Sequence, residues 1–301
     1  MLQISLLGRF HASYDGQPVK GIDGLKVQEL FSYLLLHRNR PHSRNMLACL
    51  LWEDGSPAQG KSYLRKTLWQ LQSALDSLPI GTTSSLLLAD SNWIELNPQV
   101  EFWLDVAMFE EACHHVSAIS TSKLTRSLAN ELRQAVDLYS GDLLDGWYQD
   151  WCLFERERLQ HIHYMMLQKL MDFCEEHSEY EAGIEYGMRI LRSDLARERT
   201  HRSLMRLHYL AGNRTEALRQ YERCAAVLRQ ELDVEPDQHT LTLYKRIQAA
   251  LPLATEEELA LPAFILDTRV DKLKQLQSFL DTLSIKVKQE IQTIETNNPR
   301  A

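Results

Sequence analysis

Hydrophobic positions along the first hundred residues alternate between the period of a strand and that of a helix. Residues 2–6 alternate apolar and polar side chains, which is the pattern of a half-buried strand. Asp15-Gly16 separates two further strand-like runs and favours a hairpin, because both central residues of a type I′ turn need positive φ. Apolar residues at spacings of three and four then predict one helix over about 27–35 and a second, capped by Ser43, over about 46–51.

A third helix has the clearest start signal in the chain. Ser56 suits the N-cap, Pro57 suits the first helical position, and Gln59 completes a capping box with Ser56. The helix should end by Pro79, because the residue before a proline is disfavoured in the helical conformation. Four leucines at helical spacing predict its buried line: Leu64, Leu68, Leu71 and Leu75.

A second predicted hairpin follows, in which residues 86–88 and 93–96 flank Asp90-Ser91-Asn92. Strands, three helices and a closing hairpin are typical of a winged helix, whose third helix enters the major groove of DNA. An amphipathic helix with a solvated basic face would show the same period, and the hairpins and the outward Trp69 are what favour an interface. The candidate DNA-binding residues are Arg38, Arg40, Arg44, Lys61, Ser62, Arg65, Lys66, Trp69, Ser73 and Asn92.

From about residue 101 the pattern predicts helices and no strand. Residues 180–186 align with residues 215–221 at an offset of 35, and Ala135 and Tyr139 repeat the same small-to-aromatic spacing upstream. A small residue followed four positions later by an aromatic one marks the second helix of a tetratricopeptide-type hairpin. The sequence therefore predicts stacked helical hairpins over about 101–250.

The last fifty residues combine an acidic linker with a heptad pattern. Five apolar residues recur every seven positions: Leu266, Leu273, Leu280, Val287 and Ile294. This spacing predicts a long helix that either forms a homodimer or docks back onto the chain. The expected fold is mainly α with a small β component: a winged helix over 1–100, a helical-repeat domain over 101–250, and the linker with its helix over 251–301.

The distribution of charge along the chain is compatible with DNA binding by the first domain. The 301 residues carry a net charge of −8, yet residues 1–100 hold nine Lys or Arg and eight Asp or Glu, and residues 20–70 hold eight and four. A basic region joined to an acidic domain is compatible with a DNA-binding module and a regulatory module. Five cysteines without a CxxC pair indicate buried apolar residues, and the lack of a signal-like start or a membrane-length apolar run predicts a cytoplasmic protein.

Several stretches resemble the SARP-type bacterial transcriptional activators, the antibiotic regulatory protein family. Those in the first domain are Leu6-Leu7-Gly8-Arg9-Phe10, Asp15-Gly16-Gln17-Pro18-Val19, Asn39-Arg40-Pro41, Leu51-Trp52 and Tyr63-Leu64-Arg65. Those in the second are Gly141-Asp142, Trp151-Cys152, Glu155-Arg156-Glu157-Arg158-Leu159, Tyr221-Glu222-Arg223-Cys224 and Glu231-Leu232. The resemblance spans about residues 2–250. It implies a winged helix that binds double-stranded DNA, a bacterial transcriptional activation domain, and RNA polymerase as partner.

This chain departs from the family at the third helix and at the wing. The family usually places basic residues where this chain has Gln70, Gln72 and Ser73, whereas here the positive charge lies earlier, from Lys61 to Lys66. The wing tip also has no arginine for the minor groove.

Other motifs could indicate different chemistry. Gly55-Ser56-Pro57-Ala58-Gln59-Gly60-Lys61-Ser62 fits the phosphate-loop pattern, but such a loop follows a strand, and here a helix is expected before it. We therefore expect no enzyme and no cofactor, with a P-loop NTPase and a protein scaffold without DNA binding as the alternatives. His161 and His163 lie about 200° apart on a helix and do not form a metal pair, and Glu155 to Arg158 is expected to be a solvated, salt-bridged face.

Overall fold

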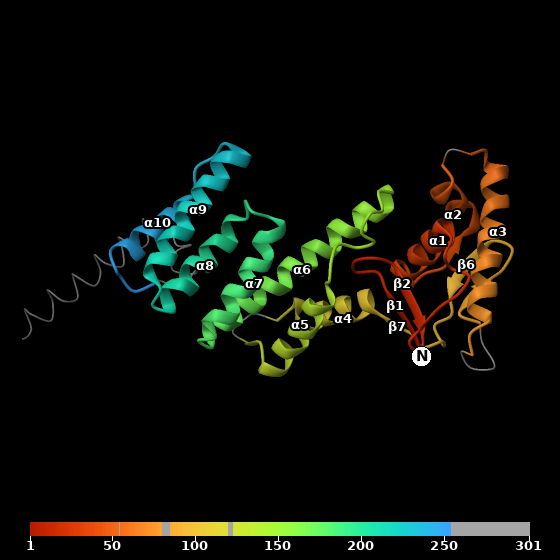
Figure 1. The fold of residues 1–301 in the computed structure, drawn as a ribbon, viewed down its shortest axis with the longest axis horizontal. Helices are drawn as coiled ribbons and strands as arrows, with labels where there is room; N and C mark the ends of the chain where they lie inside the picture. Colours follow the sequence, from red (N-terminus) through yellow and green to blue (C-terminus); the bar gives the residue numbers. More distant parts are fainter. Residues whose placement is uncertain (54, 80–84, 120–122, 254–301) are drawn as a thin grey trace, which may run out of the picture. The chain divides into compact units, whose positions relative to one another are not determined.

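The computed structural model describes residues 1–53, 55–79, 85–119 and 123–253 (Figure 1). The chain divides into two compact units, Met1–Asp194 and Leu195–Ala301. The heptad-patterned segment predicted to form a helix lies outside the described residues, and the predicted dimer through it stays a prediction. No helix within the described ranges is long and apolar enough to cross a membrane.

The first unit begins with a four-stranded sheet in the order β3-β2-β1-β7. Its strands are β1 (Leu2–Ser5), β2 (His11–Tyr14), β3 (Gln17–Pro18) and β7 (Trp103–Leu104). The predicted turn is confirmed, with φ of 48° at Asp15 and 79° at Gly16. The prediction of no strand beyond residue 101 is wrong: β7 pairs in parallel with β1, and its two residues are too few to show a period.

Three helices and a three-stranded sheet complete the winged helix. The helices are α1 (Leu25–Leu36), α2 (Arg44–Leu51) and α3 (Pro57–Asp76), and the strands, in the order β4-β6-β5, are β4 (His42–Ser43), β5 (Leu87–Ala89) and β6 (Trp93–Leu96). The predicted second hairpin is therefore confirmed as β5–β6. In Figure 1, α1, α2 and α3 lie together beside this hairpin.

The predicted helix starts differ in how they are capped. At α3 the Ser56 side chain accepts from the Gln59 backbone N–H, and the Gln59 side chain accepts from the Ser56 N–H at 3.0 Å, so the capping box is confirmed. Ser43 occupies the N-cap of α2, but its side chain makes no capping hydrogen bond. That part of the prediction is wrong, because Ser43 is also part of β4, which pairs with β6.

Helical hairpins follow, as the 35-residue repeat predicted. In the first unit α4 (Asp105–Ser117) packs on α5 (Arg126–Leu138), and α6 (Asp150–Glu176) packs on α7 (Tyr180–Ser193). In the second unit α8 (Glu198–Leu210) packs on α9 (Arg214–Leu232), and α10 (Gln238–Gln248) covers both. The aligned segments, 180–186 and 215–221, form the starts of α7 and α9, the second helices of successive hairpins.

Buried apolar side chains fill both units. In the second unit a cluster of Met205, Ala217, Leu243 and Ile247 joins α8, α9 and α10. Four of the five cysteines are buried, as expected, whereas Cys49 is exposed on α2. The mainly helical fold with a small β component is confirmed.

Candidate nucleic-acid interface

The outward face of α3 gathers most of the predicted DNA-binding residues. Its leucine line, from Leu64 to Leu75, is buried against α1 and α2. On the other side the following residues are exposed in one stripe and its flank: Lys61, Ser62, Arg65, Lys66, Trp69 and Ser73. They share a face because their spacings of three and four residues match the helical turn. Within the described part of the chain, Lys61, Arg65 and Lys66 form no ion pair.

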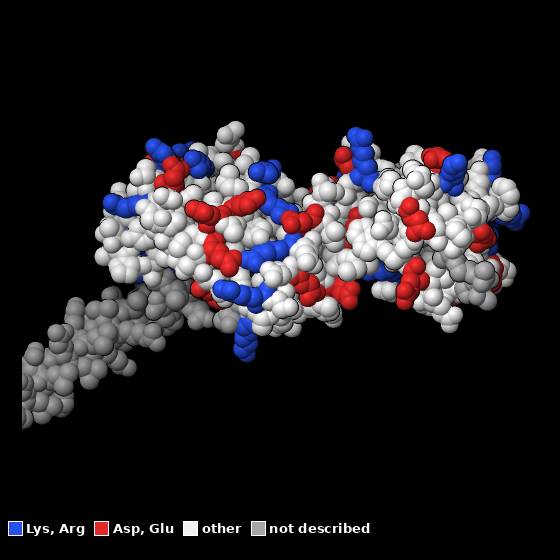
Figure 2. Space-filling view, turned by 60° about the horizontal axis from the view of Figure 1, so that its bottom comes forward, with Lys and Arg blue, Asp and Glu red and all other residues white. Residues whose placement is uncertain are grey.

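Trp69 is the most unusual member of this face, since 67% of its surface is exposed. A large aromatic side chain at this exposure, between cationic residues, is a typical contact for a partner surface. Figure 2 shows another view of the molecule, on which Lys and Arg intermingle with Asp and Glu without an extended region of one sign. The candidate interface is defined by the exposed side chains of α3.

The wing brings Arg44 and Asn92 together. The Arg44 guanidinium donates to the backbone carbonyl of Asp90 at 2.8 Å, and its backbone N–H donates to the carbonyl of Asn92 at 2.8 Å. The N–H groups of Asn92 and Trp93 donate to the Asp90 carboxylate and hold its pKa below the usual range. The tip of the wing is thus a turn built around one negative charge, and Arg44 is anchored to it.

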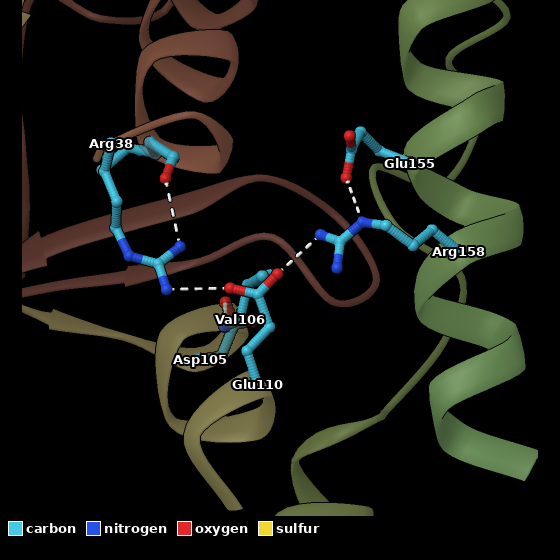
Figure 3. A network of polar contacts seen from close by, with 7 residues as sticks. Arg38, Asp105, Val106, Glu110, Glu155 and Arg158 are labelled. Carbon is cyan, nitrogen blue, oxygen red and sulfur yellow. Dashed lines mark hydrogen bonds and ion pairs between the residues drawn. The ribbon is translucent and has the colours of Figure 1, made fainter. Parts of the chain in front are cut away.

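Arg38 lies elsewhere. Its guanidinium donates to the Glu110 carboxylate of α4 at 2.8 Å, and only 20% of its side chain is exposed. Figure 3 shows that Glu110 also accepts from Arg158 of α6, which in turn pairs with Glu155 at 2.8 Å. Arg38 therefore holds α1 to the helical hairpins and is left out of the interface proposed below. Arg40, two residues further on, is exposed and forms no ion pair among the described residues.

A buried carboxylate joins the first sheet to the first hairpin. Asp105, the first residue of α4, accepts from the backbone N–H groups of Leu6, Leu7 and Val106 at 2.7 to 3.0 Å. Burial raises the pKa of Asp105, and these hydrogen bonds oppose that shift. Ser140 adds a hydrogen bond to the carbonyl of Leu7 at 2.7 Å. The winged helix is thus fastened to the helical hairpins through several polar contacts far apart in sequence.

Arg156 is a structural residue that sequence reasoning misplaced. The run from Glu155 to Arg158 was expected to be solvated, and Arg158 does form the expected ion pairs. Arg156 instead donates to the carbonyls of Leu143, Leu144 and Trp147 at 2.9 to 3.1 Å. It points inward because successive helical residues differ by about 100°. The carbonyls it binds belong to an irregular loop, which no helical period can reveal.

The phosphate-loop match is the beginning of a helix. Gly55 to Ser62 contains the N-cap and first turns of α3, and the helix α2 precedes it where a phosphate loop has a strand. Gly60 is buried, and a Cβ there would lie 3.1 Å from the carbonyl oxygen of Ala48. This glycine therefore allows α3 to approach α2 closely, which is a packing role.

The two histidines of the HxH pattern lie on different sides of α6, as predicted. His161 is exposed, whereas His163 is buried and stacks on Tyr139 with ring centroids 4.1 Å apart. Burial lowers the pKa of His163 to about 4, so its imidazole is neutral at neutral pH.

The fold and the α3 face define a class of protein, a winged helix followed by stacked helical hairpins. Residues 104–248 match the family model of the bacterial transcriptional activator domain. The chain is also similar to the regulatory protein AfsR of Streptomyces coelicolor, with 25% identity over 258 residues, or 85% of this chain and 25% of AfsR. Together these two matches support a SARP-type bacterial transcriptional activator, to which this chain is similar.

A solved structure supports the fold. Mycobacterium tuberculosis EmbR, in complex with a low affinity phosphopeptide, has a TM-score of 0.62 and 20% identity to this chain. The similarity covers 90% of this chain and 71% of EmbR. This chain spans about a quarter of the length of AfsR.

Proposed function

We propose that this chain is a transcriptional activator that binds double-stranded promoter DNA through α3 and the wing. The observation that carries the proposal is the stripe of exposed cationic residues around Trp69 on α3, which form no ion pair with any residue that the structure describes. In winged-helix proteins this helix enters the major groove, where Arg and Lys bind guanine edges and phosphates and Ser makes short polar contacts.

The proposed interface comprises α3 and its neighbours. Arg65 and Lys66, next to each other on the outward face, are the proposed centre of the contact. Arg40 and Arg44 are proposed to bind phosphates, and the wing tip to lie beside the backbone. The full set is Arg40, Arg44, Lys61, Ser62, Arg65, Lys66, Trp69, Ser73 and Asn92.

The rest of the chain is proposed to act by binding rather than by catalysis. Residues 1–100 would form the DNA-binding domain, residues 101–250 the activation domain, and residues 251–301 a linker and a helix that allows a homodimer. We propose RNA polymerase as the partner of the helical hairpins, on the strength of the family, and the bacterial cytoplasm as the place where both meet. The contacts of Arg38 and Leu6 with α4 support this proposal, because they would hold a polymerase-binding surface at a set position relative to the bound promoter.

DNA selection followed by a salt series tests the interface. The wild-type chain selects fragments from a genomic library, and affinity for one selected fragment is then measured at several salt concentrations. Arg65→Ala with Lys66→Ala should lower the salt slope by up to about 2, because each lost phosphate contact removes about one unit.

A matched variant controls for charge. Lys123→Ala with Arg126→Ala also removes two exposed cationic side chains, but these lie at the start of α5. It should leave the salt slope unchanged. If the α3 variant behaves like this control, the outward face of α3 does not bind DNA. If the wild-type chain selects no DNA at all, the scaffold alternative replaces the proposal.

A further inference from the structure

A groove of about 570 Å³ lies within the first unit, between the turn that joins α2 to α3 and the start of α6. Volumes of this order are typical of small-molecule sites, which often occur where two domains meet. Four aromatic side chains line it: Trp52, Tyr63, Tyr148 and Trp151. Tyr63 and Tyr148 are 51% and 78% exposed, which leaves their ring faces open to a ligand.

One wall of the groove binds the ammonium group of Lys26. The Nζ atom of Lys26 lies 2.7 Å from Oε2 of Glu29, 2.8 Å from the carbonyl oxygen of Leu51 and 5.9 Å from the ring centroid of Trp52. Glu29 is only 1% exposed, and Gln149 donates to its other oxygen at 3.0 Å. Carboxylate, carbonyl and aromatic face are the partners that an organic cation requires. The Lys26 ammonium neutralises the Glu29 carboxylate, so this pair leaves no net charge to bind a ligand.

Other polar groups that line the groove have no hydrogen-bond or ion-pair partner among the described residues. The lining contains two more carboxylates, Glu53 and Asp150, both exposed and without a cationic partner among the residues that the structure describes. Its buried wall contains the Nε1 donor of Trp151 and the Oε1 acceptor of Gln149, neither with a hydrogen-bond partner in the same set of residues. Trp151 is itself 8% exposed. Buried polar atoms of this kind are uncommon and call for an explanation.

We propose that this groove binds a small organic cation, an ammonium or guanidinium group carried on a flat apolar body. The charge is bound at Glu53 and Asp150, and the apolar body covers the rings of Tyr63 and Tyr148. Of these four residues, Glu53 and Tyr63 belong to the winged helix, and Tyr148 and Asp150 lie at or just before the start of α6, so the ligand contacts both parts. The proposal goes beyond DNA binding and does not depend on it.

Calorimetric titration with two matched probes tests the proposal. Tryptamine has an indole ring and an ammonium group, whereas tryptophol has the same ring and chain with a hydroxyl in place of the ammonium. We expect the full chain to bind tryptamine at least tenfold more tightly than tryptophol. Equal binding of the two probes, or no binding of tryptamine, overturns the proposal.

Two charge-neutralising variants assign the site. Glu53→Gln with Asp150→Asn should weaken tryptamine binding by about tenfold, because an exposed ion pair changes affinity by a few-fold and two are lost. Asp145→Asn with Glu157→Gln removes two exposed carboxylates that do not line the groove and should leave the affinity unchanged. If both double variants lose the same affinity for tryptamine, the effect comes from the overall charge of the protein, and the proposed site is contradicted.

A peptide distinguishes a free ligand from a partner side chain. Acetyl-Gly-Arg-Gly-amide presents a guanidinium on a polypeptide, and benzylguanidine presents one on a small molecule with a flat ring. Benzylguanidine should bind at least as tightly as the peptide, and tighter binding of the peptide would overturn the small-molecule assignment. The Glu53 and Asp150 variant should also bind selected DNA as the wild type does, since neither residue lies on the outward face of α3, so this test and that of the DNA interface can fail separately.

Discussion

Asp105 offers the sharpest test of how the winged helix is attached to the helical hairpins. It is 3% exposed, and its two oxygens accept hydrogen bonds from three backbone N–H groups. Asp105→Ala would leave the N–H groups of Leu6 and Leu7 buried without an acceptor. Each such group costs about 1–3 kcal/mol, so we expect the free energy of unfolding to fall by about 3 kcal/mol.

Asp105→Asn separates the acceptor from the charge. The Oδ2 atom of Asp105 alone accepts from both Leu6 and Leu7, each at 2.8 Å, and an asparagine oxygen placed there would keep both bonds. The bonds that Oδ1 accepts from the Val106 N–H and, at 3.0 Å, from the Leu6 N–H are lost, but Leu6 keeps its bond to Oδ2. The charge itself is no advantage, because burial raises the pKa of Asp105. The asparagine variant should therefore lose only about 1 kcal/mol.

The raised pKa also sets the direction of a pH dependence. A carboxyl whose pKa is higher in the folded state than its ordinary value of 3.8 stabilises the fold below that value. This contribution is lost as the pH rises through the raised pKa. The stability advantage of the wild type over Asp105→Asn should therefore shrink as the pH rises above 3.8.

Urea unfolding followed by tryptophan fluorescence measures these effects on the first unit, which contains Asp105. All six tryptophans lie within Met1–Asp194, so the signal reports on the first unit. Hydrogen exchange at the amides of Leu6 and Leu7 provides a local reading, which should become faster in Asp105→Ala only. Asp145→Ala, an exposed control, should stay within about 0.5 kcal/mol of the wild type. The reasoning is refuted if Asp105→Asn costs as much as Asp105→Ala.

Two further predictions concern α6 and the end of the chain. The pKa of His163 is about 4 in the folded state against an ordinary value of 6.5, so protons bind the unfolded chain first and stability falls as the pH drops between these values. His163 should contribute about 2 kcal/mol to the stability lost from pH 7 to pH 5, so the loss measured by urea unfolding should be smaller by that amount in His163→Phe. Because burial also lowers the pKa values of His37 and His42, part of the loss remains in the variant. An equal loss in the variant and the wild type would contradict the assignment. Sedimentation velocity should show a dimer for the full chain and a monomer for a truncation after Leu261, because the heptad pattern from Leu266 to Ile294 is removed, and a monomeric full chain would contradict the predicted seam.

Local signals in the sequence were sufficient to predict most individual elements. The capping box at Ser56, the turn at Asp15-Gly16 and the hairpin around Asp90 depend on neighbouring residues, and each is found where it was predicted. The 35-residue repeat predicted the helical hairpins, because hairpins of the same geometry place a small residue at the same helix–helix contact. The outward face of α3 could also be predicted, since helical period alone separates it from the leucine line.

The tertiary structure decided which polar residues are used for attachment and which stay free. Arg38 and Glu110 are 72 residues apart, and Leu6 and Asp105 are 99 apart, so no local pattern connects them. The same holds for β7, whose two residues form a strand only because β1 lies beside them, and for the groove between α3 and α6. Period and capping depend on the covalent chain within a few turns, whereas ion pairs, buried acceptors and pockets depend on which surfaces meet when the chain folds. The sequence by itself thus determined the elements and the exposed face of α3, and packing determined that Arg38 binds Glu110 rather than remaining on the surface.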